Sequence, residues 1–200
     1  EFICRAACMM FQERGLTVQP RDFLPFVGMG ENRFIGGVAE KYNFPVDLNA
    51  VKKRTYDIYL EIIKGALKPL PGVQTFINTC KSMGKKIAVA SSADQRKVLG
   101  SLAEIGLGLN QFDAVVTSED VVHKKPAPDI FLLAAERLGL NPKECLVIED
   151  AVSGITAAKA AGAQCLAITS SFSREQLNKA DYWAADLSDV SPDVLNWSKQ

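Results

Sequence analysis

Histidine is almost absent from this chain, since His123 is the only one among 200 residues. A zinc site built on histidines and a Ser-His-Asp triad are therefore poorly supported. Five cysteines occur, but no Cys-x-x-Cys spacing does. Because Cys145 and Cys165 lie in or beside strand-like apolar runs, we expect buried thiols in a reducing compartment, namely the cytoplasm.

The sequence also lacks an excess of charge and any long apolar run. Lysine plus arginine and aspartate plus glutamate both number 23, so we expect neither nucleic acid nor a membrane surface as a partner. The longest apolar runs are strand-sized, which excludes a segment that spans a bilayer. The P-loop pattern Gly-x₄-Gly-Lys-Ser/Thr does not occur either. What remains is a globular chain with 48% hydrophobic residues, enough for a sizeable core.

The chain divides into two unlike parts. Residues 1–68 contain no convincing strand, and their apolar residues follow helical spacing, as between Phe2 and Met10. The segment 68–72, Lys-Pro-Leu-Pro-Gly, is typical of a linker. We therefore predict a helical domain over residues 1–68 and a second domain over residues 69–200.

The second part alternates between short apolar runs and segments with helical spacing. The strand-like runs are residues 87–90, 112–116, 145–148 and 164–168. Strands that alternate with helices of about 10 to 15 residues indicate βαβ units. The sequence therefore predicts an α/β fold with a Rossmann-like parallel sheet.

Two adjacent carboxylates, Glu149 and Asp150, directly follow the third apolar run. Open α/β sheets bind their ligands at the carboxyl ends of the strands. Carboxylates this close repel each other unless a cation or a proton lies between them, and Mg²⁺ takes one or two carboxylates together with phosphate oxygens. The pair therefore predicts a Mg²⁺ site. The alternative is that Asp150 or Ser153 only caps the helix that follows.

A hydroxyl pair and a lysine are expected at the same edge of the sheet. Ser91 and Ser92 follow the first apolar run, where hydroxyls and free amides at a helix start bind anions. A serine that only caps the helix is the alternative. Lys125 precedes a proline-fixed helix entry, from which its ammonium can reach inward; a solvated surface lysine is the alternative. Together with the two carboxylates, these groups match a phosphate monoester with Mg²⁺.

These segments resemble three motifs of the haloacid dehalogenase (HAD) superfamily of phosphohydrolases, in particular its β-phosphoglucomutase-like group. Residues 89–92 (VASS) are similar to the phosphate-binding serine motif, and residues 125–131 (KPAPDIF) to the lysine motif. Residues 147–150 (VIED) are similar to the motif of Mg²⁺-binding acids. The resemblance covers residues 70–170, with the motifs in the family's order and spacing.

The resemblance implies roles for individual residues. It makes Ser91 and Lys125 catalytic, with Ser91, Ser92 and Lys125 contacting the phosphate. Glu149 and Asp150 become the ligands of the Mg²⁺ cofactor.

The resemblance also implies that residues 1–68 are a helical cap domain that closes over the substrate. Four residues of one cap loop are then candidates for substrate contact, namely Gly28, Glu31, Asn32 and Arg33. The alternative is an ordinary helix N-terminus with Glu31 in its first turn.

One motif of the family is absent. The Asp-x-Asp pattern, which in this family carries the nucleophile and the general acid/base, occurs nowhere in the 200 residues. In the family it lies on the first, central strand of the sheet, just before the first cap helix. We therefore expect that strand upstream of residue 1, and an open core without it.

The resemblance implies a monomeric enzyme that hydrolyses a small phosphorylated metabolite, such as a sugar phosphate. An aspartate would take the phosphoryl group and water would then release it. One alternative is a mutase that returns the phosphoryl group to a sugar. The other, if the first motif is truly absent, is a non-catalytic remnant that binds phosphate or metal.

Overall fold

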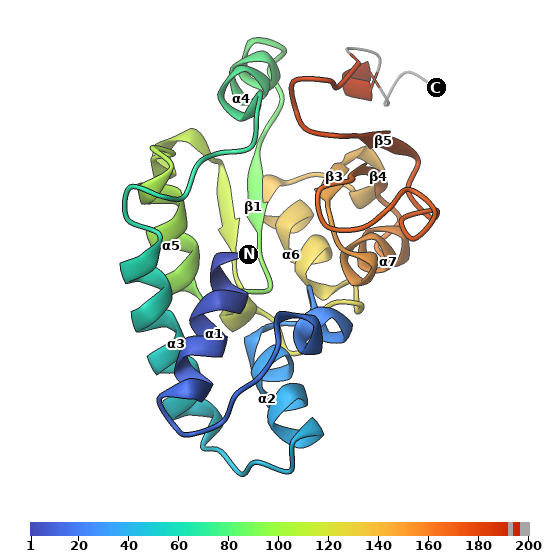
Figure 1. Cartoon of the computed structure of the whole chain (residues 1–200). Helices are drawn as coiled ribbons and strands as arrows, with labels where there is room; N and C mark the ends of the chain where they lie inside the picture. The colour runs from blue at the N-terminus through green and yellow to red at the C-terminus, as the bar shows by residue number, and fades with distance from the viewer. Residues whose placement is uncertain (192–193, 197–200) are drawn as a thin grey trace.

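The computed structural model describes residues 1–191 and 194–196. The α-helices are α1 (Phe2–Gln12), α2 (Glu31–Lys41), α3 (Leu48–Ile62), α4 (Val73–Ser82), α5 (Gln95–Glu104), α6 (Asp129–Leu138) and α7 (Val152–Ala160). The 3₁₀ helices are η1 (Pro20–Phe26), η2 (Leu109–Gln111), η3 (Ser118–Asp120) and η4 (Pro142–Glu144). The strands are β1 (Ala88–Ala90), β2 (Ala114–Val116), β3 (Leu146–Glu149), β4 (Gln164–Ile168) and β5 (Tyr182–Ala184). Figure 1 shows the helices of the first 62 residues below and to the left of the strands. None of the described helices has both the length and the apolar character needed to cross a bilayer.

The helices of residues 2–62, the helical part, enclose a hydrophobic core of their own. α1 packs along α3, and the α1 side chains Ala6, Met10 and Phe11 are fully buried on its inner face. α3 begins after Asp47, whose carboxylate accepts hydrogen bonds from two backbone amides of the first turn. This N-cap stabilises a helix start whose amides have no partner within the helix.

The buried carboxylate of Asp22 joins η1 to the end of α2. It accepts hydrogen bonds from Lys41 Nζ (2.5 Å), the Tyr42 hydroxyl (2.7 Å) and the Gln19 amide (2.8 Å). These donors, Lys41 foremost, hold the pKa of Asp22 well below its usual range.

We expect this hydrogen bonding to show in acid unfolding. Because the carboxyl pKa is depressed on folding, the unfolded state binds more protons below about pH 4, and the stability that Asp22 contributes is lost there. The melting temperature of Asp22→Asn should lie below that of the parent at neutral pH and approach it as the pH falls toward 2. Melting curves that stay a constant distance apart would contradict this role.

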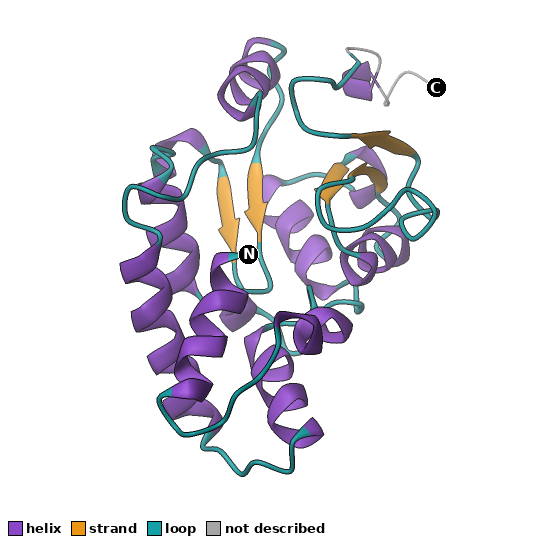
Figure 2. Ribbon diagram, viewed as in Figure 1, coloured by secondary structure: helices purple, strands orange, loops and turns teal. Residues whose placement is uncertain are grey.

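Within residues 1–191 and 194–196, all strand pairs are parallel, and the strands form two separate sheets (Figure 2). β1 pairs with β2, whereas β3, β4 and β5 form the second sheet with β4 in the middle. Helix α6 packs on β1 and β2, and α7 packs on β3 and β4. The predicted α/β fold with parallel strands is confirmed, but β5 has only three residues and was not predicted.

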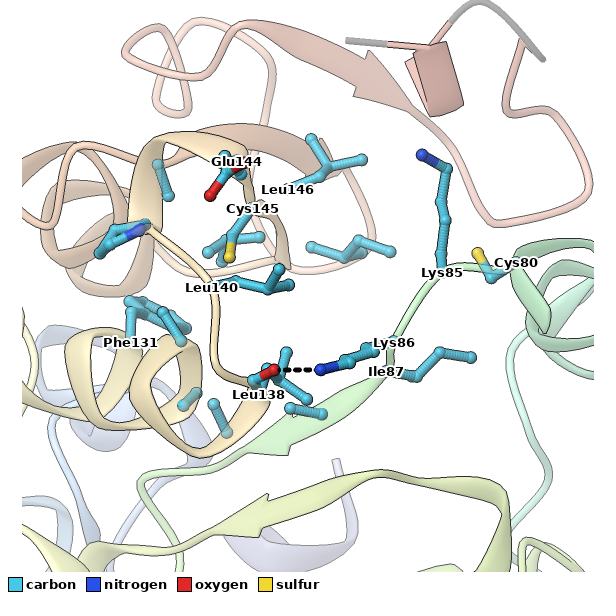
Figure 3. Close-up of a pocket in the computed structure, with 18 of the residues that line it drawn as sticks. Cys80, Lys85, Lys86, Ile87, Phe131, Leu138, Leu140, Glu144, Cys145 and Leu146 are labelled. Atoms are coloured by element: carbon cyan, nitrogen blue, oxygen red, sulfur yellow. Dashed lines mark hydrogen bonds between the residues drawn. The ribbon is translucent and has the colours of Figure 1, made fainter. Parts of the chain in front are cut away.

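The two sheets part between β1 and β3, which are both edge strands. A cavity of about 470 Å³, the slot, lies there and is lined by Ala88 and Ala90 on one side and by Leu146 and Ile148 on the other. Figure 3 shows the chain that leads into β1 facing the β3 side across this slot. The slot leaves the facing edges of β1 and β3 without a strand partner, as at any sheet edge. That a further central strand belongs between them stays a prediction.

Candidate active site

The segments that follow β1 and β3 lie at one rim, where the strands meet the helical part. Ser91, Lys125, Glu149 and Asp150 all line one cavity of about 1000 Å³, the site cavity. Its other wall comes mainly from α1, η1 and the start of α2. The structure thus brings together the hydroxyl, the ammonium and the carboxylates that the sequence places at the strand ends.

Lys125 is buried, with 6% of its surface exposed. Its Nζ atom lies 3.1 Å from Glu149 Oε1 and 3.5 Å from the backbone oxygen of Ala90. The ring centroid of Phe131 lies 4.7 Å from the same atom. The ammonium therefore bridges the two edge strands at the rim of the slot, and the alternative of a solvated surface lysine is wrong.

The carboxylate of Glu149 folds back over the start of α7. A Cβ atom on Gly154 would lie 1.6 Å from Glu149 Oε1, so the carboxylate occupies space that only glycine leaves free. Burial raises the pKa of Glu149 and the neighbouring Asp150 adds to the rise, while the Lys125 ammonium opposes it. The amide of Asp150 donates to Glu149 Oε2 at 3.1 Å, which fixes the second oxygen.

Asp150 is oriented from the end of β4. The Ser171 hydroxyl donates to Asp150 Oδ2 at 2.6 Å, and both residues line the site cavity. Ser171 was not predicted from the sequence, although it lies three residues after the fourth predicted strand, and that position was the available signal. The N-cap of α7 is Ala151 and no side chain caps it, so the alternative that Asp150 or Ser153 caps this helix is wrong.

The two serines after β1 have different surroundings. Ser91 Oγ accepts a hydrogen bond from the Ala93 amide at 3.1 Å, and the residue lines the site cavity. Ser92 Oγ donates to the backbone oxygen of Gly28 at 3.0 Å, so its hydroxyl is used to hold the helical part. The N-cap of α5 is Asp94, and neither serine occupies that position.

The four candidates for substrate contact, Gly28 before α2 and three residues of its first turn, separate into two groups. Gly28 and Glu31 line the site cavity, where Glu31 is buried and pairs with Lys97 at 2.7 Å. Asn32 and Arg33 are exposed and are not among the residues that line this cavity. Arg33 Nη1 pairs instead with Glu40 Oε2 at 2.8 Å along the same helix.

The donor set at the rim fits Mg²⁺. Glu149 and Asp150 offer carboxylate oxygens, and one or two carboxylates completed by water and phosphate oxygens are what this ion takes. Among the residues that the structure describes, no group of three or more His, Cys, Asp or Glu side chains could hold a metal.

We expect Gly154→Ala to disturb this site specifically. The added methyl group overlaps the Glu149 carboxylate, so the carboxylate must leave its place beside Lys125. Binding of Mn²⁺, used as a spectroscopic substitute for Mg²⁺, should weaken by about tenfold or more, in line with the effect of disturbing groups that orient a metal ligand. Thr156→Ala on the exposed face of the same helix is the matched control. Equal Mn²⁺ affinity in both variants would contradict this geometry.

Comparisons with known proteins place the chain among known families. The sequence model of the haloacid dehalogenase-like hydrolases matches residues 3–162. The chain is 46% identical over 182 residues to Protein SUPPRESSOR OF QUENCHING 1, chloroplastic, of Arabidopsis thaliana, which is 88% of this chain and 17% of that protein. It is 34% identical over 150 residues to fructose-1-phosphate phosphatase YqaB of Escherichia coli, which is 74% of this chain and 77% of that enzyme.

A solved structure shares the fold. CbbY from Rhodobacter sphaeroides in complex with phosphate superposes with a TM-score of 0.87 at 20% identity, over 98% of this chain and 92% of that chain. The present chain spans less than half the length of several curated relatives that it matches. The family is nevertheless shown by the match over most of the chain, and the chain belongs to the haloacid dehalogenase-like hydrolases.

Proposed function

We propose that the chain belongs to a Mg²⁺-dependent phosphatase that acts on small phosphorylated carbohydrates. The observation that carries this proposal is the buried ammonium of Lys125, held at the rim of the slot between Ala90 and Glu149. A buried cation beside a serine hydroxyl and two carboxylates suits a ligand that brings negative charge and a divalent cation together. Residues 1–68 act in this proposal as the cap over the site.

Each residue at the rim has a part in the proposed reaction. Ser91 and the neighbouring backbone amides bind phosphoryl oxygens, and Lys125 neutralises the charge that develops between nucleophile and phosphate. Glu149 and Asp150 hold the cation, and Ser171 orients Asp150. Mg²⁺, when bound, supplies positive charge to the phosphoryl oxygens.

The nucleophile is proposed to lie on a strand that fills the slot. A parallel strand between β1 and β3 ends at the same rim, so side chains after its last residue emerge between Ser91 and Glu149. An aspartate there attacks phosphorus while the bond to the leaving oxygen breaks, and a second aspartate protonates that oxygen. Water then hydrolyses the aspartyl-phosphate and releases inorganic phosphate.

The relatives and the size of the cavity support the proposed substrate class. YqaB is named a fructose-1-phosphate phosphatase, and a relative from Thermotoga maritima is named a phosphorylated carbohydrates phosphatase. The site cavity, at about 1000 Å³, has room for a sugar phosphate. A mutase that returns the phosphoryl group to the sugar is the second candidate, and a structural neighbour is a β-phosphoglucomutase. The five free thiols suit a reducing compartment such as the cytoplasm.

A version of the chain with one added N-terminal strand, called the strand-bearing chain below, tests the proposal. Glu1 lines the site cavity, so an apolar strand followed by Asp-x-Asp and a short linker can be joined to it, with the strand in the slot. We expect this strand-bearing chain to release phosphate from sugar phosphates with Mg²⁺, to lose activity with EDTA, and to form no isomerised sugar phosphate. Isomerisation without phosphate release would favour the mutase, and inactivity on the whole panel would leave a binding remnant.

A further inference from the structure

The segment between η1 and α2 is held by the strand-containing part of the molecule at several points. This segment, residues 27–31, is called the latch segment below. It crosses from the helical part to the rim of the site cavity and lines that cavity through Val27, Gly28, Gly30 and Glu31.

Two serine hydroxyls donate to neighbouring carbonyl groups of the latch segment. Ser92 Oγ lies 3.0 Å from Gly28 O, and Ser153 Oγ lies 3.3 Å from Val27 O. Ser92 follows β1, and Ser153 lies in the first turn of α7 after β3. The two donors therefore follow strands of two different sheets, one on each side of the slot.

The backbone of the latch segment is shaped for this close approach. Gly28 has φ +82°, and a Cβ atom there would lie 2.4 Å from Ser153 Oγ and 2.9 Å from Ala151 Cβ. A side chain at this position would therefore be strained by its backbone angle and would also displace the Ser153 hydroxyl. Glycine at position 28 lets the carbonyl groups reach the two serines.

An ion pair holds the far end of the latch segment. Lys97 Nζ, from α5, lies 2.7 Å from Glu31 Oε1, and both side chains are largely buried, with 18% and 8% of their surface exposed. The same ammonium lies 5.4 Å from the ring centroid of Tyr59. Glu31 is thus fixed by the protein itself at the wall of the site cavity.

We propose that Ser153 is a positioning residue that, together with Ser92 and Lys97, clasps the latch segment and so fixes its place at the wall of the site cavity. Ser153 acts through the Val27 carbonyl group. Contacts between α3 and α5, such as Arg96 with Asp57 at 2.5 Å, lie outside the latch segment. The inference that opening of the latch segment admits substrate rests on the proposed function. The two hydrogen bonds and the ion pair that hold this segment do not depend on that function.

Hydrogen exchange followed by NMR tests the clasp in the chain without any substrate. The amides of Met29 and Phe34 donate to Phe26 O and Gly30 O, so their exchange reports opening of the latch segment. Loss of one neutral hydrogen bond should accelerate both in Ser153→Ala by about two- to tenfold. Ser153→Thr, which keeps the hydroxyl, should return the rates to within about twofold of the parent, since the bond is restored.

Two further variants complete the test. Thr156→Ala removes a hydroxyl from the same helix that bonds only to Val152 O, and it should leave exchange in the latch segment unchanged. Ser92→Ala should accelerate the same two amides as Ser153→Ala does. Unchanged exchange at Met29 and Phe34 in both serine variants, or acceleration spread equally over α7, would overturn the proposal. The exchange experiment uses no substrate, so its outcome is independent of the phosphatase proposal. If only the phosphatase proposal fails, the strand-bearing chain is inactive while the exchange results still support the clasp.

Discussion

Replacing Lys125 by methionine is expected to lower the free energy of unfolding by about 3–5 kcal/mol, because the change leaves a buried carboxylate without its cation. Lys125 and Glu149 are 6% and 12% exposed in their side chains, and their charged atoms lie 3.1 Å apart. Methionine fills much of the same volume, so the loss comes from charge and not from an empty space. Urea unfolding at neutral pH measures the difference.

Two controls separate this effect from general damage. The double variant Lys125→Met/Glu149→Gln removes both charges and should recover most of the lost stability, since no unpaired charge remains buried. Lys159→Met breaks an ion pair with Asp181 whose side chains are about one third exposed, and it should cost no more than about 1 kcal/mol. Equal losses in Lys125→Met and Lys159→Met would contradict the buried pair.

Filling the slot is expected to stabilise the chain strongly. A strand between β1 and β3 pairs two unpaired strand edges and covers apolar surface such as Ile148, which is 37% exposed. We expect the strand-bearing chain to melt on the order of 5–10 °C above the chain alone, since each kcal/mol shifts the melting temperature of a chain of this size by about 2–4 °C.

A proline in the middle of the added strand is the matched control. Proline removes a backbone donor and fixes φ, so it is incompatible with a strand that is paired on both sides. The proline version should melt close to the chain alone. Equal stabilisation by both added segments would show that the segment packs elsewhere than in the slot.

Much of this architecture could be predicted from the sequence, because apolar runs and their punctuation follow from local chemistry. The runs that form β1 to β4 are apolar and sit between helical segments, and the polar residues after them could be placed at one rim by parallel topology alone. β5 was not predicted because its three residues lie in a polar region and no helix separates β5 from β4. Its strand identity comes from pairing with β4, which is a tertiary contact.

The site was less predictable where function depends on neighbours distant in sequence. Ser171 and Asp150 are 21 positions apart, and nothing in the local pattern pairs them. Burial of Lys125 could not be seen in a segment rich in lysine and proline, so the alternative of a solvated surface lysine stayed open until the structure showed 6% exposure. Ser92 and Ser91 are adjacent, but only the approach of Gly28 assigns the Ser92 hydroxyl to the helical part.

The most direct test of the account is phosphate release by the strand-bearing chain with Mg²⁺ on the best substrate of the sugar phosphate panel. We expect turnover to fall by about 100-fold or more in Lys125→Met, since removal of one group that stabilises developing charge has an effect of this size. Changing the first aspartate of the added strand to asparagine should abolish turnover altogether. Undiminished phosphate release in either variant would contradict the assignment of the rim as the catalytic centre.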